Sequence, residues 1–156
     1  MVINIRKARN KDITEIVNLN QQLFEHEKNK GFDDTLNCTW PLKNKSYFKQ
    51  SISNKNRVCF VAIENQEVVG YIIGSINNAE DYRNIKKIAE ADNMFILSKY
   101  RNQGLGSLLI KEVIKWAKLK KAKRIRVVIS ANNIQSIKFH KKVGFKDYNI
   151  TLEQEI

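Results

Sequence analysis

Apolar and polar positions follow two different spacings along the chain. Short runs that are mainly apolar or alternating predict strands at 2–8, 58–63, 68–74, 94–97 and 124–129. Apolar residues three and four positions apart predict helices from Asn10 or Asp12 to about Glu27, at 46–52 and from Leu105 to Ala117. The polar residues 64–67, between two strands, suit a hairpin turn.

Three segments lie between or beyond these elements. Residues 31–45 are irregular and hold the only proline, Pro41. Residues 77–87 form a polar connection. The tail, 145–152, predicts a last strand through the alternating apolar positions Tyr148, Ile150 and Leu152.

The junction between the strand at 94–97 and the helix from Leu105 has the sequence Arg101-Asn102-Gln103-Gly104-Leu105-Gly106. The first backbone N–H groups of a helix have no intrahelical partner, and the helix dipole adds partial positive charge there. Glycine lets an anion approach the backbone because it has no Cβ, and an arginine adds charge-assisted hydrogen bonds. The junction therefore indicates a site for a phosphate or pyrophosphate.

Two familiar phosphate loops do not fit this junction. A P-loop requires a Gly-Lys pair, which does not follow Gly104. The dinucleotide fingerprint would need glycine where Leu109 stands, and it would follow the first strand of its domain. A surface turn at a helix start is the plain alternative for Gly-x-Gly alone.

A second motif lies beyond the strand at 124–129, in a short helix that begins at Asn132 or Asn133. Its sequence is Asn133-x-x-Ser136-x-x-Phe139-His140-x-x-x-Gly144-Phe145. In this order, the two motifs resemble the signatures of the Gcn5-related N-acetyltransferase (GNAT) superfamily. That family usually has alanine where Ser136 stands and tyrosine where His140 stands. The resemblance is close over residues 57–148 and holds only in outline for the first 55 residues.

The resemblance implies an α/β fold with a single mixed, mostly antiparallel, twisted sheet and helices on both faces. The central strands, at 91–97 and 125–129, would splay apart, and the pantetheine arm of acetyl-CoA would enter the gap. Acetyl-CoA would be the co-substrate, with no metal. Phe95 to Leu97 would act through their main chain. The residues that would bind acetyl-CoA are Phe95, Ile96, Leu97, Arg101, Asn102, Gln103, Gly104, Leu105, Gly106, Asn133, Ser136 and Phe139.

Glu90 and Asp92 are the candidates for the base that removes the proton of the amine. They are two positions apart on a strand, so both side chains face the same side of the sheet. In the histone acetyltransferase branch the base lies eleven positions before the loop motif, which selects Glu90. Asp92 and an ordered water are the alternatives.

His140 and Asn133 each allow two interpretations. His140 stands where the family has the tyrosine that protonates the departing sulfur, or it is a histidine without a catalytic role. Asn133 would bind the pantetheine arm, and it also suits the N-cap of the last helix.

In this family the acceptor pocket is built from the first two helices, their loop and the hairpin. The candidates there are Glu25, Asp33, Asp34, Trp40 and Tyr82, because aromatic rings beside carboxylates suit a cationic amine. We expect an acetyl-CoA-dependent N-acetyltransferase that acts on a primary amine of a small molecule or of a peptide or protein. The alternative is a CoA-binding regulatory or nucleic-acid-associated module with the same fold and no turnover.

Composition limits the remaining possibilities. The 156 residues predict one domain, 1–156, and 28 Lys and Arg against 16 Asp and Glu give a net charge of +12. This charge would attract an anionic cofactor, but no basic stripe interleaved with aromatic residues predicts specific nucleic-acid binding. No apolar run approaches the roughly 20 residues of a membrane span. Two cysteines, Cys38 and Cys59, suit reduced thiols in a cytoplasmic protein. The oligomeric state, a homodimer included, stays open.

Overall fold

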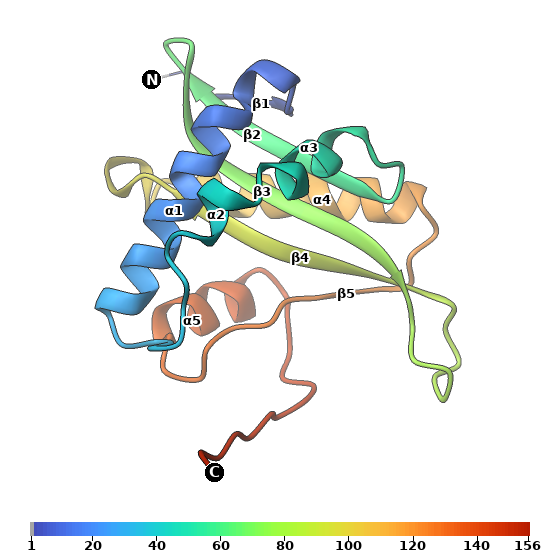
Figure 1. Cartoon of the computed structure of the whole chain (residues 1–156). Coiled ribbons are helices and arrows are strands. Elements are labelled where there is room, and N and C mark those ends of the chain that lie inside the picture. Colours follow the sequence, from blue (N-terminus) through green and yellow to red (C-terminus); the bar gives the residue numbers. More distant parts are fainter. Residues whose placement is uncertain (1) are drawn as a thin grey trace.

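A five-stranded sheet in the order β1-β2-β3-β4-β5 crosses the molecule in the computed structural model, which describes residues 2–156 (Figure 1). The strands are β1 (Asn4–Lys7), β2 (Arg57–Glu64), β3 (Glu67–Asn78), β4 (Lys87–Ile96) and β5 (Arg124–Arg126). The helices are α1 (Ile13–Asn29), α2 (Trp40–Lys43), α3 (Lys45–Ser53), α4 (Leu105–Leu119) and α5 (Ile134–Lys142), with short 3₁₀ turns at Asn10–Asp12 and Ser98–Tyr100. Neighbouring strands are antiparallel except β4 and β5, which are parallel.

The turn between β2 and β3 confirms the hairpin predicted at 64–67. Asn65 and Gln66 have φ of +48° and +69°. Two central residues with positive φ are characteristic of a type I′ turn, whose twist matches that of the flanking strands. Strand β3 then continues to Asn78, four residues beyond the predicted end at Gly74.

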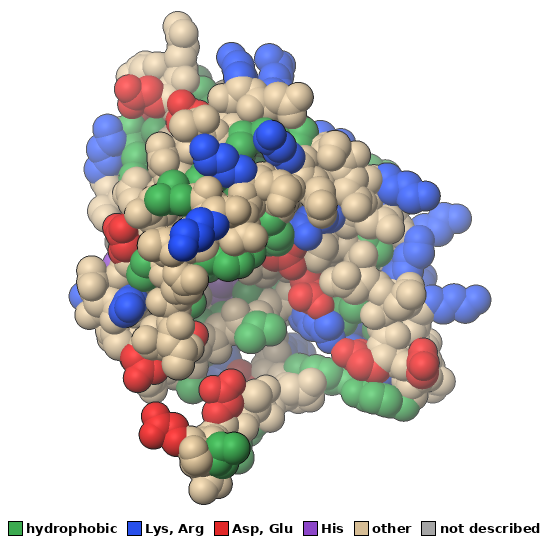
Figure 2. Space-filling model, in the orientation of Figure 1, with side chains coloured by type: hydrophobic (Ala, Val, Ile, Leu, Met, Phe, Trp, Pro, Cys, Tyr) green, Lys and Arg blue, Asp and Glu red, His purple; other side chains and the backbone are tan. Residues whose placement is uncertain are grey.

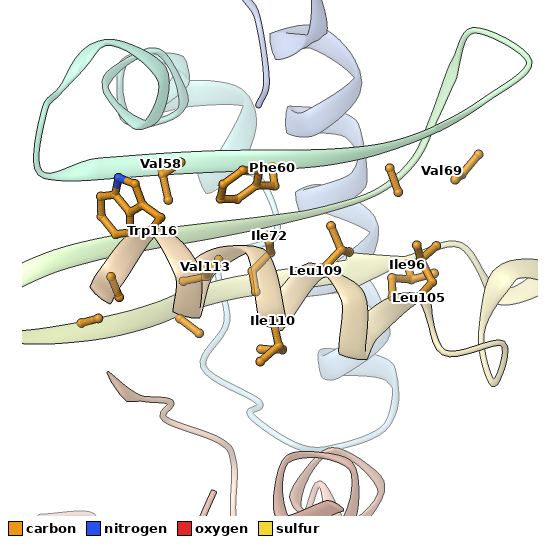
Figure 3. Packing of buried hydrophobic residues seen from close by; sticks show 14 of the residues in the cluster. Val58, Phe60, Val69, Ile72, Ile96, Leu105, Leu109, Ile110, Val113 and Trp116 are labelled. Carbon is orange, nitrogen blue, oxygen red and sulfur yellow. The ribbon is translucent and has the colours of Figure 1, made fainter. Parts of the chain in front are cut away.

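The sheet separates two apolar cores. Helices α1 and α3 cover one face, where Ile16, Val17 and Phe48 pack against strand residues. Helix α4 covers the other face with one stripe of its surface, as its apolar spacing predicts. Figure 3 shows this second core, whose labelled members are Val58, Phe60, Val69, Ile72, Ile96, Leu105, Leu109, Ile110, Val113 and Trp116.

Strands β4 and β5 separate after a short pairing. Their register runs only from Ile88 opposite Arg124 to Glu90 opposite Arg126, whereas β4 stays paired with β3 up to Ile96. The second half of β4 therefore has no strand on its other side. This confirms the predicted α/β fold with a mixed sheet and a splayed central pair.

Several predicted elements have different bounds in the structure. The strand expected at 124–129 ends at Arg126, because the chain leaves β4 there and runs towards α5 (Figure 1). The segment 31–45 is not wholly irregular, since α2 occupies Trp40–Lys43 with Pro41 in its first turn, where proline is tolerated.

The last strand predicted at 145–152 is wrong. Within the described chain, residues 145–156 form no helix or strand. An alternating sequence forms a strand only where a sheet edge can pair with it. Here Tyr148, Ile150 and Leu152 are 67%, 89% and 88% exposed.

Candidate active site

The turn before α4 presents open backbone to solvent. Gly104 is the N-cap of the helix, with a left-handed φ of +81°, and Asn102 has φ +60°. A Cβ placed on Gly104 would have no atom within 4 Å, so the space in front of this backbone is empty. No side chain caps the helix, and its first turn contains no acidic residue. The first N–H groups of α4 are therefore free to bind an anion.

Arg101 is anchored beside this turn rather than extended into solvent. Its Nε donates to the carbonyl oxygen of Ile96 at 2.7 Å, and its guanidinium lies 5.0 Å from the ring centroid of Phe95. Gln103 donates from Nε2 to the carbonyl oxygen of Lys99 at 2.9 Å, which closes the turn.

Gly106 has a different role from Gly104. A Cβ on Gly106 would meet Cζ of Phe139 at 2.9 Å, so helix α5 packs directly against the first turn of α4. Phe139, predicted to contact the co-substrate, does not line either cavity described below. The contact instead fixes α5, and with it the rest of the second motif, beside the turn that precedes α4.

The main chain of β4 faces the gap at alternate residues. Leu97 donates its N–H to the carbonyl oxygen of Val69 at 3.0 Å, which directs it towards β3. Because successive residues of an antiparallel strand point in opposite directions, Phe95 also faces β3, whereas Met94 and Ile96 face the gap. Of the three predicted main-chain contacts, only Ile96 is directed there. Met94 was missed, although alternation along the strand could have identified it.

Two cavities meet on the face of the sheet covered by α1 and α3. The central cavity, of about 420 Å³, lies between α1, β4 and α5, and the side cavity, of about 450 Å³, lies between α3, β3 and β4. Figure 2 shows a hollow in this face in which both acidic and basic side chains appear, while many further Lys and Arg side chains project from the edges of the molecule. The residues that line both cavities are Tyr47, Ala91, Asp92 and Val128.

Glu90 and Asp92 line the same cavity wall, as their spacing predicts, but their surroundings differ. Glu90 accepts from Nε of Arg126 at 2.8 Å, and the same guanidinium also pairs with Glu80. Asp92 accepts from Ser75 Oγ at 2.9 Å, and Arg57 lies 3.6 Å from its other oxygen. Burial raises the pKa of Asp92, against the opposing effects of the Ser75 hydrogen bond and Arg57.

Three predicted residues of α5 lie on the opposite wall of the central cavity. Asn133 accepts from the backbone N–H of Ser136 at 3.1 Å, which confirms its N-cap role. His140 is buried, and its Nδ1 lies 2.8 Å from the carbonyl oxygen of Ser136. A carbonyl oxygen only accepts, so Nδ1 carries a proton. Burial lowers the pKa of His140, which favours the neutral ring with no proton on Nε2.

Of the five residues predicted for an acceptor pocket, one lines the central cavity. Trp40 lines it, as predicted, together with Asn20, Phe24, Glu27 and Tyr47, which were missed. The other acceptor candidates, Glu25, Asp33, Asp34 and Tyr82, line neither cavity.

The described residues, 2–156, contain no group of three or more His, Cys, Asp or Glu side chains placed to hold a metal ion. Among the helices in that part of the chain, none has the length and apolar character of a bilayer span.

This chain is similar to known proteins in both sequence and fold. An N-alpha-acetyltransferase of Sulfurisphaera tokodaii is 24% identical over 151 residues, covering 94% of this chain and 81% of that protein. An uncharacterized N-acetyltransferase of Methanocaldococcus jannaschii is 25% identical over 104 residues, 67% of this chain, and the match spans 46% of that protein's length. The crystal structure of a predicted acetyltransferase with acetyl-CoA from Clostridium acetobutylicum superposes with a TM-score of 0.79 at 22% identity, covering 99% of this chain and 96% of that one.

The family comparison covers most of the chain. Residues 13–145 match the family described as "Acetyltransferase (GNAT) family", a range that includes both sequence motifs and both cavities. The chain therefore belongs to the acetyltransferase (GNAT) family.

Proposed function

We propose that the central cavity is the acetyl-transfer site of this acetyl-CoA-dependent N-acetyltransferase, and that Asp92 is its base. The acceptor is a primary amine of a small molecule or of a peptide or protein. Acetyl-CoA would place its pyrophosphate on the N-terminus of α4, at Gly104, and its pantetheine arm in the gap beside β4. The empty space at Gly104 and the unpaired edge of β4 support this arrangement.

The position of Asp92 at the junction of the two cavities carries this proposal. A lysine-type amine has a pKa of about 10.4, so it is mostly protonated at neutral pH and needs a base. Asp92 has a raised pKa and only one short hydrogen bond, from Ser75. Glu90 already accepts from the guanidinium of Arg126, so its carboxylate is engaged in an ion pair. The geometry thus favours Asp92 over Glu90.

The reaction forms one bond and breaks another. The deprotonated amine nitrogen attacks the thioester carbonyl carbon, the carbon–sulfur bond breaks, and Asp92 holds the proton that the amine lost. A main-chain N–H group of Met94 or Ile96 would polarise the carbonyl oxygen. The departing thiolate, with a thiol pKa of about 8.5, takes a proton from solvent at the open mouth of the cavity.

An assay of CoA release with a broad panel of amines, peptides and aminoglycosides tests this function. We expect Asp92→Asn to lower kcat/KM by roughly 10²- to 10⁴-fold, as for the loss of a general base, with acetyl-CoA binding retained. The isosteric Glu90→Gln should lower it by less than about 10-fold. The reverse order would assign the base to Glu90. Tight acetyl-CoA binding without turnover on any acceptor would instead support a CoA-binding module.

A further inference from the structure

The lining of the central cavity differs in charge from the rest of the protein. The chain contains 28 Lys and Arg against 16 Asp and Glu. Among the described residues that line this cavity, however, two are carboxylates, Glu27 and Asp92, and none is Lys or Arg. A cavity that excludes basic residues in so basic a protein is complementary to a cationic ligand.

Glu27 is a half-buried carboxylate without a paired cation. It lies on the last turns of α1, and within residues 2–156 no hydrogen bond or ion pair engages its carboxylate. Burial raises the pKa of Glu27, and nearby Asp33 adds to this effect. Since an unpaired carboxylate is costly to bury, a bound cation would satisfy it.

A second acceptor atom on the same helix also lacks a partner. Asn20 is 1% exposed, and its Oδ1 has no hydrogen bond, while its Nδ2 donates to Tyr71 at 2.7 Å. Asn20 and Glu27 are seven residues apart, so they lie on one face of α1. Both line the central cavity and both call for an N–H donor.

Aromatic rings form another part of the cavity wall. Phe24 and Trp40 are stacked, with centroids 6.1 Å apart, and Tyr47 meets Trp40 edge-on at 5.3 Å. All three rings line the cavity. Such a wall accommodates methylene groups and favours an ammonium over a ring face.

The spacing of the acceptors sets the length of the ligand. Nδ2 of Asn20 lies 3.3 Å from Oδ1 of Asn93, which places this level of α1 beside Asp92. Glu27 is seven residues further along α1 than Asn20, and at about 1.5 Å of rise per residue it lies roughly 10 Å from Asn20 along the helix axis. A cation at Asp92 and a second at Glu27 would therefore be separated by about the length of an eight-carbon chain.

We propose, on the basis of the function proposed above, that the acceptor is a linear diamine or polyamine and that Glu27 binds the ammonium group that is not acetylated. The reacting amine lies at Asp92, the methylene chain crosses the aromatic wall, and the distal ammonium reaches Glu27. Glu27 is thus the residue that determines specificity for acceptors with two charges.

The test compares two acceptors that differ only at the distal end, 1,8-diaminooctane and 8-amino-1-octanol. We expect the wild-type kcat/KM to favour the diamine by roughly 10- to 100-fold, the range for a hydrogen bond between charged groups. Glu27→Gln should bring this ratio of kcat/KM values close to one, because it should raise the KM for the diamine. Glu25→Gln, on the same helix but outside both cavities, should keep the wild-type ratio.

Other outcomes distinguish the two proposals. A ratio near one in the wild type, or a wild-type ratio that survives Glu27→Gln, overturns the role of Glu27. If no amine is acetylated, the proposed function fails, and titration calorimetry with 1,8-diaminooctane then decides the binding site. Binding that Glu27→Gln weakens by at least about 10-fold supports it, and no binding, or equal binding, overturns it.

Discussion

The contact between Gly106 and Phe139 allows a prediction in which two opposing effects can be separated. Gly106→Ala places a Cβ 2.9 Å from Cζ and 3.2 Å from Cε2 of Phe139. Relief of this overlap requires the Phe139 ring to shift or α5 to move away from α4, and overpacking of this kind costs about 1–3 kcal/mol. Gly106 does not have a left-handed φ, so alanine also gains up to about 1 kcal/mol of helix propensity. The clash should outweigh the gain in helix propensity, so the free energy of unfolding should fall by roughly 1 kcal/mol.

The variant Phe139→Leu supplies the control, because it removes the ring that alanine would meet. In that background, Gly106→Ala should become neutral or stabilising by up to about 1 kcal/mol. Urea unfolding of the four proteins measures the coupling energy, which we expect to be at least about 1 kcal/mol. Equal destabilisation in both backgrounds would refute the packing role of Gly106. The Cβ would also point towards α5 rather than the proposed pyrophosphate site at Gly104, so the double variant should bind acetyl-CoA nearly as well as Phe139→Leu.

Two further predictions concern ionisable groups. Arg6 donates to both oxygens of buried Asp12, at 2.7 and 2.9 Å, and chiefly this hydrogen bonding lowers the pKa of Asp12. Asp12→Asn should therefore reduce the free energy of unfolding by about 1.5–3 kcal/mol at pH 7. The difference should shrink as pH falls below about 3.9, where Asp12 of the unfolded chain becomes protonated, and it should be lost below the lower pKa of the folded protein. A difference independent of pH in urea unfolding would contradict this. Because burial lowers the pKa of His140, its ring stays neutral above about pH 6.5, and Nδ1–H is committed to Ser136. His140→Ala should then lower kcat by less than about 10-fold from pH 7 to 9. A loss of roughly 10²-fold would instead identify His140 as the general acid, provided that the wild-type kcat falls at high pH and the variant loses this fall.

Local sequence signals predicted much of the sheet and the turn that precedes α4. The turn at 64–67 and the stripe of α4 depend on neighbouring residues, so the sequence alone indicates them. Helix α2 was missed because four residues, with Pro41 among them, are too short to show a helical period. The tail strand was predicted wrongly because alternation shows a capacity to pair, whereas the splay of β5 decides whether an edge is available.

The acceptor side of the site depends on how α1 is rotated about its axis. Glu25 and Glu27 are both polar residues in one helix, and composition does not distinguish them. Two positions correspond to about 200° of rotation, so only one can face the cavity. The spacing of Asn20, Phe24 and Glu27 marks the inward face, but this signal becomes useful only once that face is placed over β4.

The measurement that tests the account most directly is acetyl-CoA binding to two variants of Gly104. Asparagine and aspartate both tolerate the left-handed φ of +81° and have nearly the same shape, so they differ mainly in charge at the helix N-terminus. In titration calorimetry, with melting temperatures as a check on folding, Gly104→Asp should bind acetyl-CoA at least about 10-fold more weakly than Gly104→Asn, because its carboxylate would face the pyrophosphate. Equal affinity in two folded variants would contradict the assignment of this turn as the pyrophosphate site.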